Sequence, residues 1–150
     1  MTDFIKQRLW EPLKNQLKQG ATPEKLAWSL AAGGVVGTFP VLGTTTLLGL
    51  LCGFVFRLNH IAVQVALNVT YPLQLLFLIP LMAAGGRLLG APVPGSLDAL
   101  KAELAAGVWL TIKHFAWASL GGILLWLIVA LPLTVGLRYA LTPAIRKFQA

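Results

Sequence analysis

Two long stretches of the chain carry no charged residue, and each is interrupted near its middle by a proline among polar residues. The first runs from Leu26 to Phe56 and the second from Leu58 to Gly86. Charge-free apolar runs longer than about 18 residues are typical of membrane-embedded segments. Irregular backbone survives at membrane depth only where protein or a water-filled cavity shields it. The pattern therefore predicts two proline-broken or re-entrant helical hairpins.

Pro40 and Gly43 mark the first break, and Pro72 marks the second. Each break divides its block into helical pieces that, at about 1.5 Å per residue, fall short of the roughly 30 Å hydrocarbon core. Around the second break we expect one piece from Asn59 to Thr70 and another from Leu73 to Leu89. Two such pieces form either a re-entrant hairpin or one long broken crossing.

Local signals predict helices outside these breaks. Thr22-Pro23-Glu24 is a strong helix start, because threonine caps, proline suits the first helical position and glutamate complements the helix dipole. Ser96 is expected to cap a short amphipathic helix over residues 97–106. The chain divides into an amphipathic interfacial helix (residues 1–20), a membrane domain (residues 21–138) and a short basic tail (residues 139–150).

A third charge-free block, Phe115 to Leu137, is long enough for one full membrane crossing. The predicted fold class is therefore an all-α integral membrane protein with two proline-broken hairpins, one transmembrane helix and flanking amphipathic helices. If both basic termini lie in the cytoplasm, the number of full crossings is even. One of the first two blocks then crosses and the other returns.

Composition supports the membrane interpretation. The chain is 57% hydrophobic and only 11% charged, so a soluble domain of this kind could not cover its own surface with polar groups. The net charge of +7 comes from basic residues outside the apolar blocks, as expected for positive-inside flanks. Those flanking residues are Lys6, Arg8, Lys14, Lys18, Lys25, Arg138, Arg146 and Lys147. This distribution argues against nucleic-acid binding and places the N-terminus in the cytoplasm.

Small residues recur at a spacing that lets two helix backbones approach closely. Three pairs of glycines are separated by three residues each: Gly33 and Gly37, Gly49 and Gly53, and Gly86 and Gly90. Such pairs are typical of contacts between membrane helices, within one chain or between copies. We therefore expect close helix packing and a homo-oligomer.

Catalytic groups are nearly absent from the apolar blocks. All five acidic residues lie outside them, and His60 and His114 have no other metal ligand at a suitable spacing. The sequence therefore predicts no enzyme, no metal site and no cofactor.

The polar breaks are the remaining candidate site. A helix that opens at Thr44, Thr45 and Thr46 points its first amides and three hydroxyls at the break, which favours an anion. Arg57 and Arg87 could add charge to such a site. Neutral partners on the other side are Gln64, Asn68, Thr70, Tyr71 and Gln74. The alternative is that these groups cap one another and only fix the packing.

Several segments resemble a bacterial membrane family known as domain of unknown function 2062. They are residues 22–27, 37–46, 57–60, 71–74 and 86–90, within a resemblance that covers residues 20 to 138. Much of that family carries Asn-Pro-x-Thr where this chain has Tyr71-Pro72-Leu73-Gln74, which indicates a subfamily. Similar domains occur beside glycosyltransferases and envelope-lipid enzymes, so the resemblance implies a lipid or glycolipid context.

Together these observations lead to one expected function and one alternative. We expect a small multi-pass protein of the bacterial inner membrane that binds or translocates an anionic lipid or lipid-linked headgroup. The alternative is an accessory subunit that scaffolds a membrane enzyme. A translocator needs a polar cavity open to one face, whereas the polar breaks of a scaffold are packed dry.

Overall fold

The computed structural model describes residues 7, 11, 15 and 22–150, and all regular structure from Thr22 onward is helical. The helices are α3 (Pro23–Val36), α4 (Thr45–Val55), α5 (His60–Leu88), α6 (Leu97–Ala106) and α7 (Val108–Gln149). The described part of the chain thus confirms the predicted all-α class. The interfacial helix predicted over residues 1–20 lies outside the described residues, apart from three single positions.

The predicted helix starts are confirmed. The Thr22 side chain accepts a hydrogen bond from the Lys25 amide at 3.3 Å, and Pro23 is the first residue of α3. Ser96 likewise accepts from the Ala99 amide at 3.2 Å and begins α6 with the predicted bounds. Both side chains replace a backbone partner that the first turn of a helix lacks.

The first predicted break is present and the second is not. Residues 37–44 form a loop between α3 and α4, whereas α5 continues through both Pro72 and Pro80. The expected break at Pro72 is therefore wrong. The physical reason is that Gln74, a polar residue expected to serve a second break, is fully buried and bonds to the first loop instead. A proline removes only one backbone donor, which a packed membrane helix tolerates.

Helices α3 and α5 run in the same direction in close contact. A Cβ atom at Gly33 would lie 2.3 Å from the Val63 carbonyl oxygen, and one at Gly37 would lie 2.8 Å from that of Leu67. An advance of four residues along α3, from Gly33 to Gly37, thus matches an advance of four residues along α5, from Val63 to Leu67. These glycines bring the two backbones together, as their spacing predicted.

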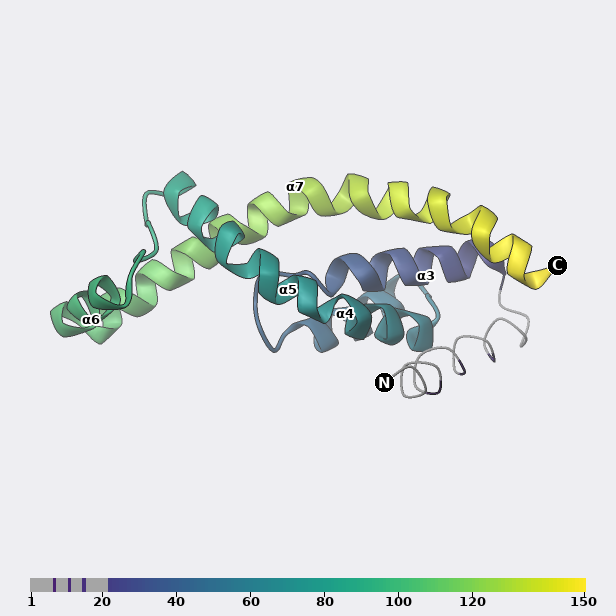
Figure 1. The fold of residues 1–150 in the computed structure, drawn as a ribbon, viewed down its shortest axis with the longest axis horizontal. Helices are drawn as coiled ribbons and strands as arrows, with labels where there is room; N and C mark the ends of the chain where they lie inside the picture. The colour runs from purple at the N-terminus through teal and green to yellow at the C-terminus, as the bar shows by residue number, and fades with distance from the viewer. Residues whose placement is uncertain (1–6, 8–10, 12–14, 16–21) are drawn as a thin grey trace.

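Helix α4 runs back along α5 in the opposite direction. A Cβ at Gly49 would lie 2.7 Å from the Leu67 side chain, and one at Gly53 would lie 2.6 Å from Nδ1 of His60. α3, the loop and α4 therefore form a helical hairpin beside α5 (Figure 1). The last residues of α4 therefore lie at the same side of the molecule as the first residues of α3.

A third glycine contact joins α5 to α7, one residue away from the predicted pair. A Cβ at Gly85 would lie 2.1 Å from the Gly122 amide nitrogen, and one at Gly121 would lie 2.2 Å from the Gly85 carbonyl oxygen. Gly86 also packs against α7, but Gly90 has a φ of 72° and turns the chain after α5. The close contact therefore depends on Gly85, which the pattern did not single out.

Helix α7 is the longest element, with 42 residues and a length of about 63 Å. It crosses the whole molecule and packs on α6, α5 and α3 in turn (Figure 1). It continues through Pro132 and Pro143, so the predicted basic tail is the last part of this helix rather than a separate segment. Near its end, Ile145 and Leu141 pack on Leu26 and Ala27 of α3.

Much of the apolar surface faces outward. Leu47, Phe54 and Ile79 are 62–78% exposed, with many more on α4, α5 and α7. Among the described residues, α5 and α7 are long and apolar enough to cross a membrane by length and composition, and α4 is a shorter apolar helix. That one of the first two blocks crosses a membrane and the other returns stays a prediction.

Candidate functional site

The loop between α3 and α4 is held by a side chain from α5. The side-chain nitrogen Nε2 of Gln74 donates to the backbone carbonyl oxygens of Phe39 at 2.7 Å and Val41 at 3.3 Å. The Thr44 hydroxyl also donates to Val41, at 2.9 Å. The carbonyls freed by the break are thus satisfied inside the protein, while the buried side-chain oxygen of Gln74 has no partner.

The middle of α7 holds the same loop from the other side. Nε1 of Trp126 donates to the Thr38 hydroxyl at 3.1 Å, and that hydroxyl donates to the Val35 carbonyl at 2.7 Å. The Trp126 and Phe39 rings meet edge to face, with centroids 5.1 Å apart. Edge-to-face pairs of this kind stabilise packing beyond the area they bury. The loop is therefore fixed by both long helices.

Three of the predicted binding residues lie at the start of α4. Thr44 is the N-cap residue, but its side chain makes no capping bond to the helix. Thr45 is buried and Thr46 is exposed. The first amides of a helix have no partner within the helix, so the structure retains the donors on which the predicted anion site depends. An anion at Thr44–Thr46 stays a prediction.

Gln74 is also at this loop, whereas the other predicted residues are not gathered there. Asn68 donates to the Gln64 carbonyl of its own helix at 2.7 Å, and Tyr71 is 42% exposed. Arg57 follows the far end of α4, an 11-residue helix about 16 Å long. Arg87 lies in the last turn of α5, at the opposite end of the molecule. The two arginines therefore flank different ends of the fold.

The two residues that mark the first break have distinct structural roles. Pro40 is fully buried in the loop, and Gly43 has a φ of 82°, a left-handed conformation that favours glycine. Both fix the course of the chain between α3 and α4, as expected for a helix break.

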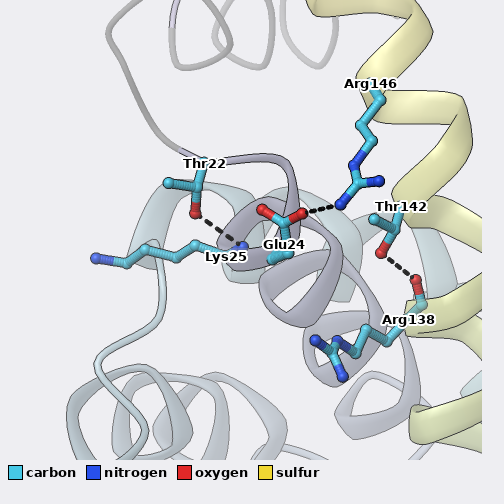
Figure 2. Close-up of polar contacts among 6 residues, drawn as sticks. All are labelled: Thr22, Glu24, Lys25, Arg138, Thr142 and Arg146. Atoms are coloured by element: carbon cyan, nitrogen blue, oxygen red, sulfur yellow. Dashed lines mark hydrogen bonds and ion pairs between the residues drawn. The ribbon is translucent and has the colours of Figure 1, made fainter.

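A second polar region lies where α3 begins and α7 ends (Figure 2). Arg146 donates to the Glu24 carboxylate and thereby lowers the pKa of that carboxyl from its ordinary value. The Arg138 guanidinium stacks 4.7 Å from the centroid of Trp28 and 5.0 Å from that of Tyr139. Its buried Nε atom has no hydrogen-bond partner. This end of the fold therefore holds a partly buried guanidinium between two aromatic rings.

An apolar groove of about 420 Å³ lies between α3, α5 and α7. It begins beside the loop at Thr38 and Trp126 and reaches Leu137, the residue before Arg138. Its other lining residues are Gly34, Val35, Thr70, Leu73, Phe77, Leu81, Val129, Ala130 and Leu133. The Thr38 and Thr70 hydroxyls bond to nearby backbone carbonyls, so the groove presents mainly carbon. It suits a hydrocarbon chain.

The sequence interpretation did not identify the roles of Trp126 and Arg138. A signal was available for Trp126, which is the central residue of the charge-free block from Phe115 to Leu137. A buried indole N–H requires an acceptor, so a tryptophan there implies a polar partner at the same depth. Trp28 and Arg138 are far apart in sequence, and no pattern connects them.

The described residues contain no group of three histidine, cysteine, aspartate or glutamate side chains that could hold a metal ion. The His114 ring and the Glu103 carboxylate form a close pair that links α7 to α6. This pair fixes the junction of those two helices.

Comparison with known proteins identifies a family but no characterised relative. The model of the family described as "Uncharacterized protein conserved in bacteria (DUF2062)" matches residues 4–149. No curated protein and no solved structure matches.

Proposed function

The chain belongs to the DUF2062 family of bacterial proteins, and we propose that it is a multi-pass protein of the cytoplasmic membrane that binds an anionic lipid or lipid-linked molecule. The observation that carries this proposal is the apolar groove, whose lining reaches Leu137, the residue before Arg138. A hydrocarbon chain would lie in the groove, and its charged headgroup would lie at Arg138.

The spacing of charges supports the membrane arrangement. Between His60 and Arg87, α5 rises about 40 Å, and between His114 and Arg138, α7 rises about 36 Å. Neither stretch contains a charged residue. Both exceed the roughly 30 Å hydrocarbon core and leave room for the headgroups on each side. We therefore infer that α5 and α7 cross the bilayer.

The hairpin of α3 and α4 would enter and leave on one side. Its loop bonds to Trp126, midway along the charge-free part of α7. The irregular backbone would then lie near the middle of the bilayer, shielded by α5 and α7 as such backbone must be. A re-entrant hairpin beside two crossings is the arrangement we propose.

The orientation follows from the charge at the two ends. We call the end where α3 begins and α7 finishes the basic end. Its cations include Lys25, Arg57, Arg138, Arg146 and Lys147, and Glu24 at this end is paired with Arg146. By the positive-inside rule this end would face the cytoplasm.

The test is native mass spectrometry of the purified protein with its retained lipids. Leu133 lines the groove and is 47% exposed, so Leu133→Trp would fill the groove without disturbing the core. Leu131→Trp is the matched control, because Leu131 is 69% exposed and outside the groove. We expect the wild type and Leu131→Trp to retain an anionic lipid and Leu133→Trp to lose it. Equal retention by both variants would contradict the groove site.

The second candidate function is a scaffold subunit for a membrane enzyme. It is favoured by the loop itself, where Gln74, Thr38 and Thr44 bond to backbone carbonyls of the protein. Groups packed in this way fix structure rather than transport a headgroup. A wild-type protein that retains no anionic lipid above the background of a control membrane protein would favour this alternative. Homo-oligomerisation stays a prediction for either function.

A further inference from the structure

We propose that a basic cavity where α3, α4 and the start of α5 meet, separate from the apolar groove, binds a phosphomonoester or diphosphate group. The cavity has a volume of about 630 Å³. It is lined by Lys25, Gly53, Phe54, Val55, Arg57, Leu58 and His60. The inference rests on the proposed function only in placing this cavity at the cytoplasmic surface of the membrane.

Three basic side chains reach the cavity from three separate elements. Lys25 lies in the first turn of α3, Arg57 in the turn after α4, and His60 at the start of α5. Among the residues that the structure describes, no acidic side chain lines the cavity. A site built from three converging elements differs from a run of neighbouring lysines on a solvated helix face.

No acidic side chain in the described part of the chain forms an ion pair with Lys25 or Arg57. Among the described residues, the ion pairs are His114 with Glu103 and Arg146 with Glu24, so neither involves these two cations. Glu24 is adjacent to Lys25 in sequence, but it points toward Arg146 while the Lys25 side chain extends away from that pair (Figure 2). Two cations are thus available to an added anion.

The turn that carries Arg57 is built in an unusual way. The Leu58 amide bonds to the Gly53 carbonyl at 2.9 Å and the Arg57 amide to the Phe54 carbonyl at 3.4 Å. This is the Schellman pattern, whose left-handed position is commonly filled by glycine. Here that position is Arg57, with a φ of 52°. The arginine side chain therefore occupies a position where the backbone alone would favour glycine or asparagine.

Gly53 gives His60 its place in the cavity. A Cβ at Gly53 would lie 2.6 Å from Nδ1 and 2.8 Å from Cε1 of the ring, so the imidazole lies directly against the α4 backbone. The ring adds a hydrogen-bonding nitrogen beside the two cations.

The charge of the cavity indicates the chemical class of its ligand. Lys25 and Arg57 supply two positive charges, and a phosphomonoester carries about −1.5 to −2 at neutral pH. Arginine suits such a group because its planar guanidinium donates two parallel hydrogen bonds to phosphate oxygens. A phosphodiester with one negative charge would leave half of the site unmatched. The ligand is therefore a terminal phosphate or diphosphate, either on a lipid headgroup or free in the cytoplasm.

The experiment compares binding of two probes to the full-length protein in neutral detergent. Inorganic pyrophosphate, followed by calorimetry, represents the free ligand. Phosphatidic acid against phosphatidylglycerol, followed by native mass spectrometry, represents the lipid. Arg57→Asn removes the charge and keeps a residue that tolerates the left-handed backbone, and Lys25→Gln removes the second charge. Arg87→Gln is the matched control, because Arg87 is an exposed arginine at the other end of the fold.

We expect each cavity variant to weaken binding about tenfold and Arg87→Gln to leave it unchanged. Loss of pyrophosphate binding identifies a free phosphate ligand, and loss of the preference for phosphatidic acid alone identifies a lipid headgroup. Equal losses in Arg87→Gln, or wild-type affinity in both cavity variants, would overturn the inference. Leu133→Trp separates the two proposals, because it removes the groove and leaves this cavity intact.

Discussion

The contact between α3 and α5 allows a sharp test with neighbouring glycines. In Gly33→Ala the new methyl group would lie 2.3 Å from the Val63 carbonyl oxygen and 2.8 Å from its Cα atom. Ordinary van der Waals contact begins near 3.4 Å, so the two backbones must separate by about 1 Å. Overpacking of this kind costs about 1–3 kcal/mol. The higher helix propensity of alanine offsets about 1 kcal/mol of that cost.

We therefore expect Gly33→Ala to lower the free energy of unfolding by up to about 2 kcal/mol, which corresponds to a fall of up to about 8 °C in the melting temperature of a chain this long. The assay is thermal unfolding of the purified protein in detergent. Gly34→Ala is the matched control, because its methyl group would meet only the Thr70 methyl at 3.7 Å. That variant should melt at or above the wild-type temperature. If the two variants have the same melting temperature, the stability of the protein does not depend on the close approach of α3 and α5.

Three further predictions concern the loop and the basic end. Gln74→Leu removes the donor to the loop carbonyls and should lower the free energy of unfolding by about 1–3 kcal/mol, measured by the same melting assay; wild-type melting would contradict the role of Gln74. Replacing Thr44, Thr45 and Thr46 together by valine should weaken lipid retention without abolishing it if the predicted anion site is correct, since the backbone amides remain, and unchanged retention would reject that site. The lowered pKa of Glu24 means that its ion pair stabilises the fold at neutral pH and is lost as the pH falls through that lowered pKa. Glu24→Gln removes this ion pair, so the melting temperature of the variant should fall less steeply than that of the wild type below about pH 4. A variant with the wild-type pH profile would refute the link.

Local sequence signals predicted the helix boundaries where the decisive contacts are local. The starts of α3 and α6 follow from Thr22 and Ser96, whose side chains bond to amides three residues ahead. The first break was predictable because Pro40 and Gly43 act on their own backbone. At this range, residue type and spacing determine the structure.

Sequence failed where the outcome depends on a distant partner. Pro72 looks like a helix break in isolation, but it lies inside a helix that packs along its length on other elements. Gln74 bonds to a carbonyl 35 positions earlier, and Trp126 to a hydroxyl 88 positions earlier. No periodicity encodes such pairs, so the second break and the partners of the first loop could not be assigned correctly.

Gln74 also has a consequence for the order in which the protein is assembled. The Phe39 and Val41 carbonyls accept locally from the Val41 amide and the Thr44 hydroxyl, but the partners that pack over the loop are Gln74 of α5 and Trp126 of α7. Both partners are synthesised after the hairpin. In the proposed membrane arrangement, a nascent chain that ends before α5 would leave the irregular backbone of this loop without the protein that must shield it at membrane depth. In that arrangement the hairpin would reach its final depth only after both long helices have been synthesised.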